Sequence, residues 1–180
     1  MRIKEFSQIA TKSGDSGKAA DYSGNRIKKS DPLFELLGTI DETNTFIGLS
    51  YHYGHNEDLK KIQKTLERAA AQIAMDPGSK SYEKLEKLDA SDVSWLEKAG
   101  QKALGETGFE AGFVLPGSDT SMTGAFYDVA RTIARRCERA VWRYIETSRR
   151  KDLETITEYI NRLSDYLYVL ARMEKPGDTN

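Results

Sequence analysis

The sequence has 180 residues, of which 38% are hydrophobic and 31% are charged, and this length suffices for one domain with a single core. The 27 Lys and Arg are balanced by 28 Asp and Glu, which gives a formal net charge of −1 and leaves no positive excess for general binding to nucleic acid or to an anionic membrane. A lone cysteine, Cys137, excludes an internal disulfide and a cysteine-based zinc site. No apolar run approaches the roughly 20 residues of a spanning helix, and the N-terminal residues Met1 to Phe6 lack a signal-peptide hydrophobic region, so we expect a cytoplasmic protein with no membrane partner.

The first two predicted helices follow a polar, glycine-rich segment. Asp31 and Pro32 form a helix start signal, and apolar residues at helical spacing then predict a helix over about 32–53. A second amphipathic pattern covers about 56–75 and stops at Asp76-Pro77-Gly78. Both helices have clear ends, because their boundary residues are typical caps and breakers.

Three further helices are predicted in the rest of the chain. Ser91 is the expected cap of a short helix that Gly105 closes, and longer patterns cover about 121–148 and 152–173. Alternation typical of strands is absent from the sequence at any convincing length. We therefore predict an all-α, five-helix up-and-down bundle over 32–173, with a Gly-rich N-terminal arm over 1–31 and a disordered tail over 174–180.

The arm is the first candidate for chemistry. It reads Thr11-Lys12-Ser13-Gly14-Asp15-Ser16-Gly17-Lys18, and glycines beside lysines can close backbone N–H groups and ammonium charges around phosphate oxygens. It is not a Walker loop, because two residues instead of four separate Gly14 from Gly17 and Ala19 occupies the position of the magnesium-binding hydroxyl. A flexible tail is the alternative interpretation.

The helix over 121–148 carries a polar stripe. Its members are spaced three or four residues apart and so share one side: Asp128, Arg131, Arg135, Glu138, Arg139 and Trp142. The simpler interpretation is a solvated face with helical ion pairs worth about 0.3–0.5 kcal/mol each, and a tryptophan that lies in the core or at a helix contact. The sharper hypothesis is a phosphate-binding surface, because arginine grips phosphate through two parallel hydrogen bonds.

Other polar residues have simpler interpretations. Asp41 follows Gly38-Thr39-Ile40, and a carboxylate among apolar neighbours favours a cationic partner, for which Arg135 is a candidate. His52 and His55 have helical spacing without an evident third ligand, so we expect surface histidines and no metal site. Cys137 falls at a core position, where it is expected to be a small buried hydrophobe.

Five blocks together resemble one family, the PduO-type ATP:cob(I)alamin adenosyltransferases, in order and spacing. They extend over about residues 11–172 and read Thr11-Lys12-Ser13-Gly14-Asp15-Ser16-Gly17, Gly38-Thr39-Ile40-Asp41-Glu42-Thr43-Asn44, Phe113-Val114-Leu115-Pro116-Gly117, Val129-Ala130-Arg131-Thr132-Ile133-Ala134-Arg135-Arg136-Cys137-Glu138-Arg139 and Tyr159-Ile160-Asn161-Arg162-Leu163-Ser164-Asp165.

The resemblance implies a homotrimer with ATP between subunits, held by the arm of one protomer and the arginine helix of its neighbour. By family analogy the arm residues of the ATP site are Thr11, Lys12, Gly14, Asp15, Lys18 and Lys28. The bundle residues that line the nucleotide are Arg131, Glu138, Arg139 and Asn161. Asp41 and Arg135 match an ion pair between subunits, and Phe113 matches a residue that keeps the lower axial ligand off cobalt.

The implied reaction is attack of a Co(I) nucleophile on C5′ of ATP, which forms a cobalt–carbon bond and expels triphosphate. Its substrates and cofactors are ATP, Mg²⁺ and cob(I)alamin or another reduced corrinoid, and a corrinoid reductase is a possible partner. No general base is required, since the cofactor supplies the nucleophile and the protein supplies position and electrostatics.

The sequence departs from the family pattern at several positions, three of which bear on activity. Ser16 replaces a basic residue, Gln72 ends an Arg-Ala-Ala-Ala-Gln segment where relatives usually carry Asp-Cys-Gly and an acid, and Asp128 replaces a common histidine. These departures leave open a second hypothesis, a non-catalytic relative that binds ATP or a corrinoid as a sensor or carrier.

Overall fold

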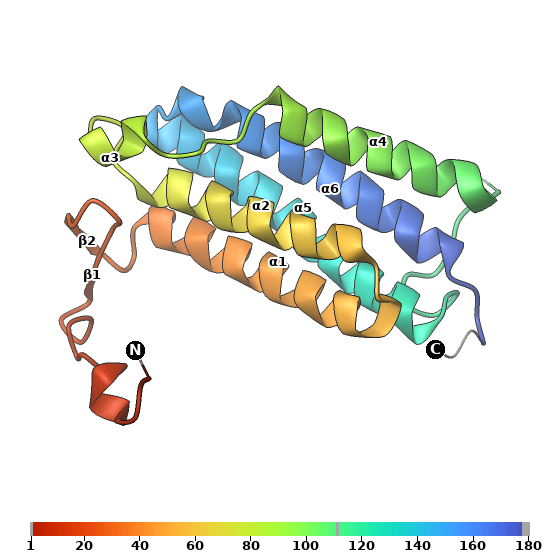
Figure 1. The fold of residues 1–180 in the computed structure, drawn as a ribbon, viewed down its shortest axis with the longest axis horizontal. Helices are drawn as coiled ribbons and strands as arrows, with labels where there is room; N and C mark the ends of the chain where they lie inside the picture. The colour runs from red at the N-terminus through yellow and green to blue at the C-terminus, as the bar shows by residue number, and fades with distance from the viewer. Residues whose placement is uncertain (1, 111, 178–180) are drawn as a thin grey trace.

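The computed structural model describes residues 2–110 and 112–177, and its main feature is a set of five long helices that run side by side (Figure 1). They are α1 (Pro32–Gly54), α2 (Glu57–Ala74), α4 (Ala90–Thr107), α5 (Met122–Ser148) and α6 (Glu154–Met173). Two shorter elements lie between long helices, α3 (Lys80–Glu83) and the 3-10 turn Lys151–Leu153, and a further 3-10 turn, Phe6–Gln8, lies in the arm. The prediction of a mostly helical chain is confirmed. The predicted tail falls partly on 178–180, which lie outside the described residues.

Side-chain caps fix where the helices begin. Asp31 accepts a hydrogen bond from the backbone N–H of Leu33 (2.9 Å) with Pro32 in the first turn, as the sequence predicts. Helix α4 differs, because its cap is Asp89, whose carboxylate accepts from the N–H of Ser91 (2.7 Å). The side chain of Asp92 accepts from the N–H of Asp89 and completes a capping box, so the cap lies two residues before the expected one.

Helix α5 lies against both α1 and α6, while α2 packs on α1 and α4 packs on α6. The buried side chains along these contacts form one continuous hydrophobic core. Cys137 lies inside it with no exposed surface, which confirms its prediction as a small buried hydrophobe. Burial also raises the pKa of its thiol to about 12, so it is no candidate nucleophile at neutral pH.

The arm contains a hairpin that the sequence did not predict. Strand β1 (Lys18–Ala20) pairs antiparallel with β2 (Arg26–Lys28), and the carboxylate of Asp21 closes the turn by accepting from the N–H groups of Ser23 (2.9 Å) and Asn25 (2.8 Å). Each strand has three residues, too few for alternation to be visible in the sequence.

The hairpin docks on the end of α2. The backbone N–H of Tyr22 donates to the carbonyl of Ala74 (2.9 Å), and the N–H of Asp76 donates to the hydroxyl of Ser23 (2.8 Å). These bonds satisfy groups that the end of a helix leaves open. The part of the arm that precedes the hairpin extends away from the bundle (Figure 1).

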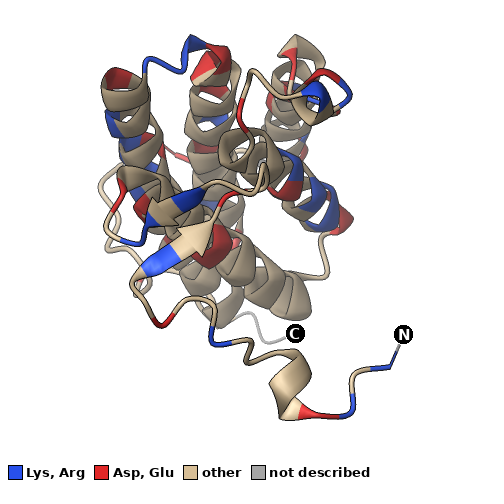
Figure 2. Ribbon diagram, turned by 90° about the vertical axis from the view of Figure 1, so that its left-hand side faces the viewer, with Lys and Arg blue, Asp and Glu red and all other residues tan. Residues whose placement is uncertain are grey.

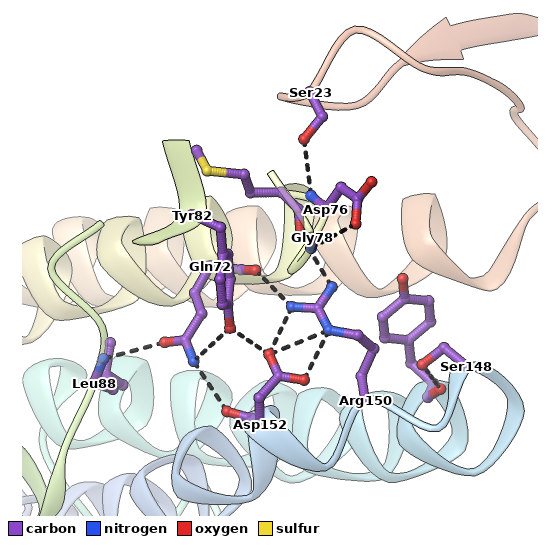
Figure 3. Close-up of polar contacts among 11 residues, drawn as sticks. Ser23, Gln72, Asp76, Gly78, Tyr82, Leu88, Ser148, Arg150 and Asp152 are labelled. Atoms are coloured by element: carbon purple, nitrogen blue, oxygen red, sulfur yellow. Dashed lines mark hydrogen bonds and ion pairs between the residues drawn. The ribbon is translucent and has the colours of Figure 1, made fainter. Parts of the chain in front are cut away.

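A polar network stiffens the end of the bundle to which the hairpin attaches (Figure 3). Arg150 donates to Asp152 (2.8 Å) and to the carbonyls of Gln72 (3.0 Å) and Met75 (3.1 Å) at the end of α2. Tyr82 donates to the same carboxylate. The side chain of Gln72 is buried and bridges the carbonyl of Asp152 (3.0 Å) and the N–H of Leu88 (3.1 Å). Gln72, a departure from the family pattern, therefore joins three segments of the fold.

We expect the free energy of unfolding to fall as the pH rises above about 8.5, where an unperturbed thiol begins to ionise. Burial raises the pKa values of Cys137, Tyr127, Tyr159 and Tyr166. The unfolded chain loses these protons at lower pH than the native chain, so stability decreases with pH in that window. Urea denaturation at pH 8 and pH 10 measures this loss of stability, and the loss should be smaller in Tyr159→Phe, which has one fewer buried phenol. Equal stability at both pH values would contradict the prediction.

Candidate functional site

The outer side of α5 carries arginines without acidic partners. Arg135 and Arg139 are exposed, and neither forms an ion pair within residues 2–110 and 112–177. Their one shared contact is the bond from Nη1 of Arg139 to the carbonyl of Arg135 (2.9 Å). Elsewhere Figure 2 shows both signs of charge interspersed over the helices. These two guanidinium groups are thus available to an anion.

A groove between α5 and α6 adjoins the arginines. Nδ2 of Asn161 donates to Oε1 of Glu138 (3.1 Å), which places two of the predicted nucleotide residues in direct contact across the helices. The groove has a volume of about 240 Å³, and Trp142 forms part of its wall. The side chain of Trp142 is 46% exposed, so of its two predicted places, the core or a helix contact, the core is excluded.

Asp128 is the centre of a buried charge cluster. Its side chain is 4% exposed; it accepts from Nε of Arg131 (3.0 Å) and also binds Arg172 of α6, whose side chain is 5% exposed. The N–H of Gly117 donates to the same carboxylate (3.0 Å). One acid therefore joins α5, α6 and the loop that leads from Phe113 to α5.

The 112–121 loop presents Phe113 to solvent. Phe113 is 92% exposed and Leu115 is 55% exposed, although the loop itself is well fixed. The carboxylate of Asp119 accepts from the N–H of Leu115 (2.8 Å), and the hydroxyl of Thr120 donates to the carbonyl of Ala171 (3.0 Å). A large apolar side chain on an anchored loop is a suitable wedge for a flat apolar ligand.

The arm places two predicted phosphate ligands side by side. Lys18 and Lys28 are directly opposite each other in the hairpin, and both are exposed. Like charges in that relation destabilise a hairpin, and an anion between them removes the repulsion. Lys29 approaches Gly14 so closely that a Cβ there would lie 2.8 Å from its Nζ, which brings a third ammonium group to the glycine segment.

Asp41 and Arg135 do not meet within the protomer. The ion pair between α1 and α5 joins Glu42 to Arg136, one position further along each helix. Asp41 is exposed and lines a cavity of about 310 Å³ with Tyr22 and Asn44. An Asp41–Arg135 pair thus requires a second copy of the chain.

The structure brings together Arg135, Glu138, Arg139 and Asn161 on one side of α5 and α6. Arg131 lies on the same helix, but its guanidinium group is already paired with Asp128. The remaining predicted ligands, Thr11, Lys12, Gly14, Asp15, Lys18 and Lys28, lie in the arm, and no hydrogen bond or ion pair in the described chain links them to these α5 and α6 residues. Phe113 belongs to a third region.

Sequence reasoning missed Arg172. The spacing of Asp128 and Arg131 shows a possible helical pair, but Arg172 lies 44 residues further along the chain, and no local pattern connects it with Asp128. His52 and His55 are both exposed. Among the described residues, no cluster of three or more His, Cys, Asp or Glu could hold a metal ion.

Known proteins are similar to this chain in sequence and fold. The cobalamin adenosyltransferase family model matches residues 9–174. The corrinoid adenosyltransferase PduO of Citrobacter freundii is 34% identical over 171 residues, which cover 92% of this chain and 49% of that protein. A second corrinoid adenosyltransferase of Citrobacter freundii is 33% identical over 172 residues, with 93% and 95% covered. A phenylalanine-to-alanine variant of a PduO-type ATP:corrinoid adenosyltransferase from Lactobacillus reuteri, complexed with cobalamin and ATP, has a TM-score of 0.78 at 27% identity over 91% of both chains.

The chain belongs to the cobalamin adenosyltransferase family, as the sequence blocks predicted. It spans about half the length of the PduO relatives that it matches (49%). None of the helices in the described chain combines the length and apolar character needed to cross a membrane.

The buried cluster predicts a large cost for Asp128→Ala. This change leaves the buried Arg172 without its carboxylate and should lower the free energy of unfolding by about 3–5 kcal/mol. Glu42→Ala removes an exposed pair with Arg136 and should cost less than about 1 kcal/mol. Urea denaturation of both variants measures the difference, and equal losses would refute the assigned role of Asp128.

Proposed function

We propose that the protein is an ATP:corrinoid adenosyltransferase, which moves the 5′-deoxyadenosyl group of ATP onto Co(I) of a reduced corrinoid and releases triphosphate. The observation that carries this proposal is the contact of Glu138 with Asn161 beside Arg135 and Arg139, which form no ion pair with any described residue. Family membership and a neighbour complexed with cobalamin and ATP support it. The proposed location is the cytoplasm.

The proposed ATP site lies between protomers of a homotrimer. Among the described residues of one protomer, Lys18 and Lys28 have no bond to Arg135 and Arg139, and none of these four side chains has an acidic partner. An arm that reaches the α5 of a neighbour would unite them around one triphosphate. The same arrangement would place Asp41 near the neighbour's copy of the arginine helix and allow a pair with Arg135.

The arginines and lysines would stabilise charge that develops on the leaving triphosphate. Arg135 and Arg139 offer planar donors, while Lys12, Lys18 and Lys28 offer compact charges. Arg135 and Arg139 are carried by a helix, and Lys18 and Lys28 by a hairpin that is formed before the reaction, so little reorganisation of these four groups is required. Mg²⁺ would bind with the triphosphate, whose oxygens are its preferred ligands, and would supply further positive charge there.

Phe113 would contact the corrinoid. An exposed aromatic ring on a loop tied to Asp128 and Ala171 can press against one face of the corrin and occupy the position of the lower ligand. Removal of that ligand makes Co(II) easier to reduce to the nucleophilic Co(I), by an electron from a separate reductase. The residues of this chain would exclude the lower ligand and hold C5′ of ATP in line with cobalt.

An anaerobic assay with cob(I)alamin and MgATP tests the proposal. An enzyme converts the cob(I)alamin spectrum to that of an alkylcobalamin, whereas a sensor or carrier binds its ligand and gives no product. Absence of product with the wild-type protein under reducing conditions would favour the non-catalytic alternative.

We expect Arg139→Ala to lower the rate of adenosylation by at least about 100-fold, because it removes a donor to the leaving group. The oligomer must remain intact by light scattering. Arg143→Ala is the control, since Arg143 is another exposed arginine one turn further along α5 that we assign no role. A fully active Arg139→Ala enzyme would refute the site assignment.

A further inference from the structure

Trp142 is an unusual residue on the surface of α5. Its side chain is 46% exposed, and its indole has no aromatic, cationic or hydrogen-bonded partner within the described chain. The other tryptophan, Trp95, is half-buried and is covered by the ammonium group of Lys61 at 3.9 Å from the ring centroid. A large open ring is a typical platform for a flat ligand.

The groove beside Trp142 has room for one ring system. Its volume of about 240 Å³ is below the roughly 300–1,000 Å³ of pockets that hold a whole small-molecule ligand. The groove includes the Glu138–Asn161 pair, and its other lining residues come from α6: Glu154, Thr157, Glu158 and Arg162. It is therefore suited to one end of an elongated molecule, with the rest of that molecule outside.

The charge of the groove decides which end enters. Three carboxylates line it, and Arg162 is already engaged with Glu97 (2.8 Å) and with the side-chain oxygen of Asn161 (2.8 Å). This surface repels a triphosphate but accepts a neutral heterocycle. Arg135 lies seven residues before Trp142 on the same helix, about 10 Å along its axis, which is the separation a nucleotide needs between base and phosphates.

We propose that Trp142 stacks on the adenine of ATP and thereby fixes the base in the groove, with the phosphates directed toward Arg135 and Arg139. This inference rests on the proposed function and adds a residue that determines how the nucleotide is oriented. Stacking of a base on an aromatic ring is worth enough to change affinity about tenfold on substitution by alanine.

The two tryptophans provide matched variants for a fluorescence test. In Trp95→Phe the sole tryptophan is Trp142, and titration with MgATP should change its emission as in the wild type. In Trp142→Phe the sole tryptophan is Trp95, and the emission should not change. A response that survives in Trp142→Phe and vanishes in Trp95→Phe would overturn the inference.

Calorimetry separates base stacking from a structural role. Trp142→Ala should raise the Kd for MgATP about tenfold, and Trp142→Phe should raise it less than about threefold because a ring remains. The Kd for inorganic triphosphate, which has no base, should be equal in wild type and Trp142→Ala, with the same oligomer by light scattering. Equal losses of affinity for ATP and triphosphate, or no loss for ATP, would overturn the inference.

The same titrations distinguish this inference from the proposed function. A wild-type protein that binds ATP and forms adenosylcobalamin, with ATP affinity unaffected by Trp142→Ala, refutes the role of Trp142 alone. A wild-type protein that binds no ATP refutes both.

Discussion

The carboxylate of Asp128 is the interaction on which the candidate site depends. It is buried between two guanidinium groups and also accepts from the backbone of Gly117, so it sets α5 against α6 and fixes the loop that carries Phe113. A buried charge is stable only when it is fully paired, and the three donors to Asp128 fulfil that condition. The proposed nucleotide and corrinoid regions therefore share one support.

The departures from the family pattern at Gln72 and Asp128 have local explanations. Gln72 bonds to Leu88 and Asp152, and Asp128 bonds to Arg172, so each residue has partners that suit it. Substitutions that are matched in this way preserve the geometry around them. Neither departure removes a group from the face formed by Arg135 and Asn161, which favours a retained activity over the sensor or carrier alternative. Ser16 is different, since it lies in the arm and nothing in the structure explains it.

Local signals sufficed for the helices but not for the connections. The start signal at Asp31 and Pro32 and the apolar periodicity that follows lie close together in the sequence, so they suffice to predict α1. Local patterns of the same kind predict α5 and α6. The hairpin docks on the carbonyl of Ala74, and Asp128 binds Arg172. Both partners are distant in sequence, so a short sequence pattern could predict neither contact. Trp142 was predicted to lie in the core or at a helix contact, and only packing decides on which side of α5 an open groove lies. Glu138 and Asn161 were predicted as nucleotide residues from the family blocks, and their direct contact is known only from the structure.

The charge distribution suggests why assembly and nucleotide binding belong together. In the protomer, Lys18 is opposite Lys28, and Arg135 and Arg139 lack acidic partners within the described chain. An anion would reduce the repulsion between the like charges on the hairpin and on α5. A triphosphate held between an arm and a neighbouring α5 would relieve both at once. Its binding energy would then contribute to contact between copies of the chain, and that contact would raise the affinity for the nucleotide by the same factor, because the two equilibria are linked. The docked hairpin reduces the entropy lost when the arm binds, since part of it is already ordered on α2.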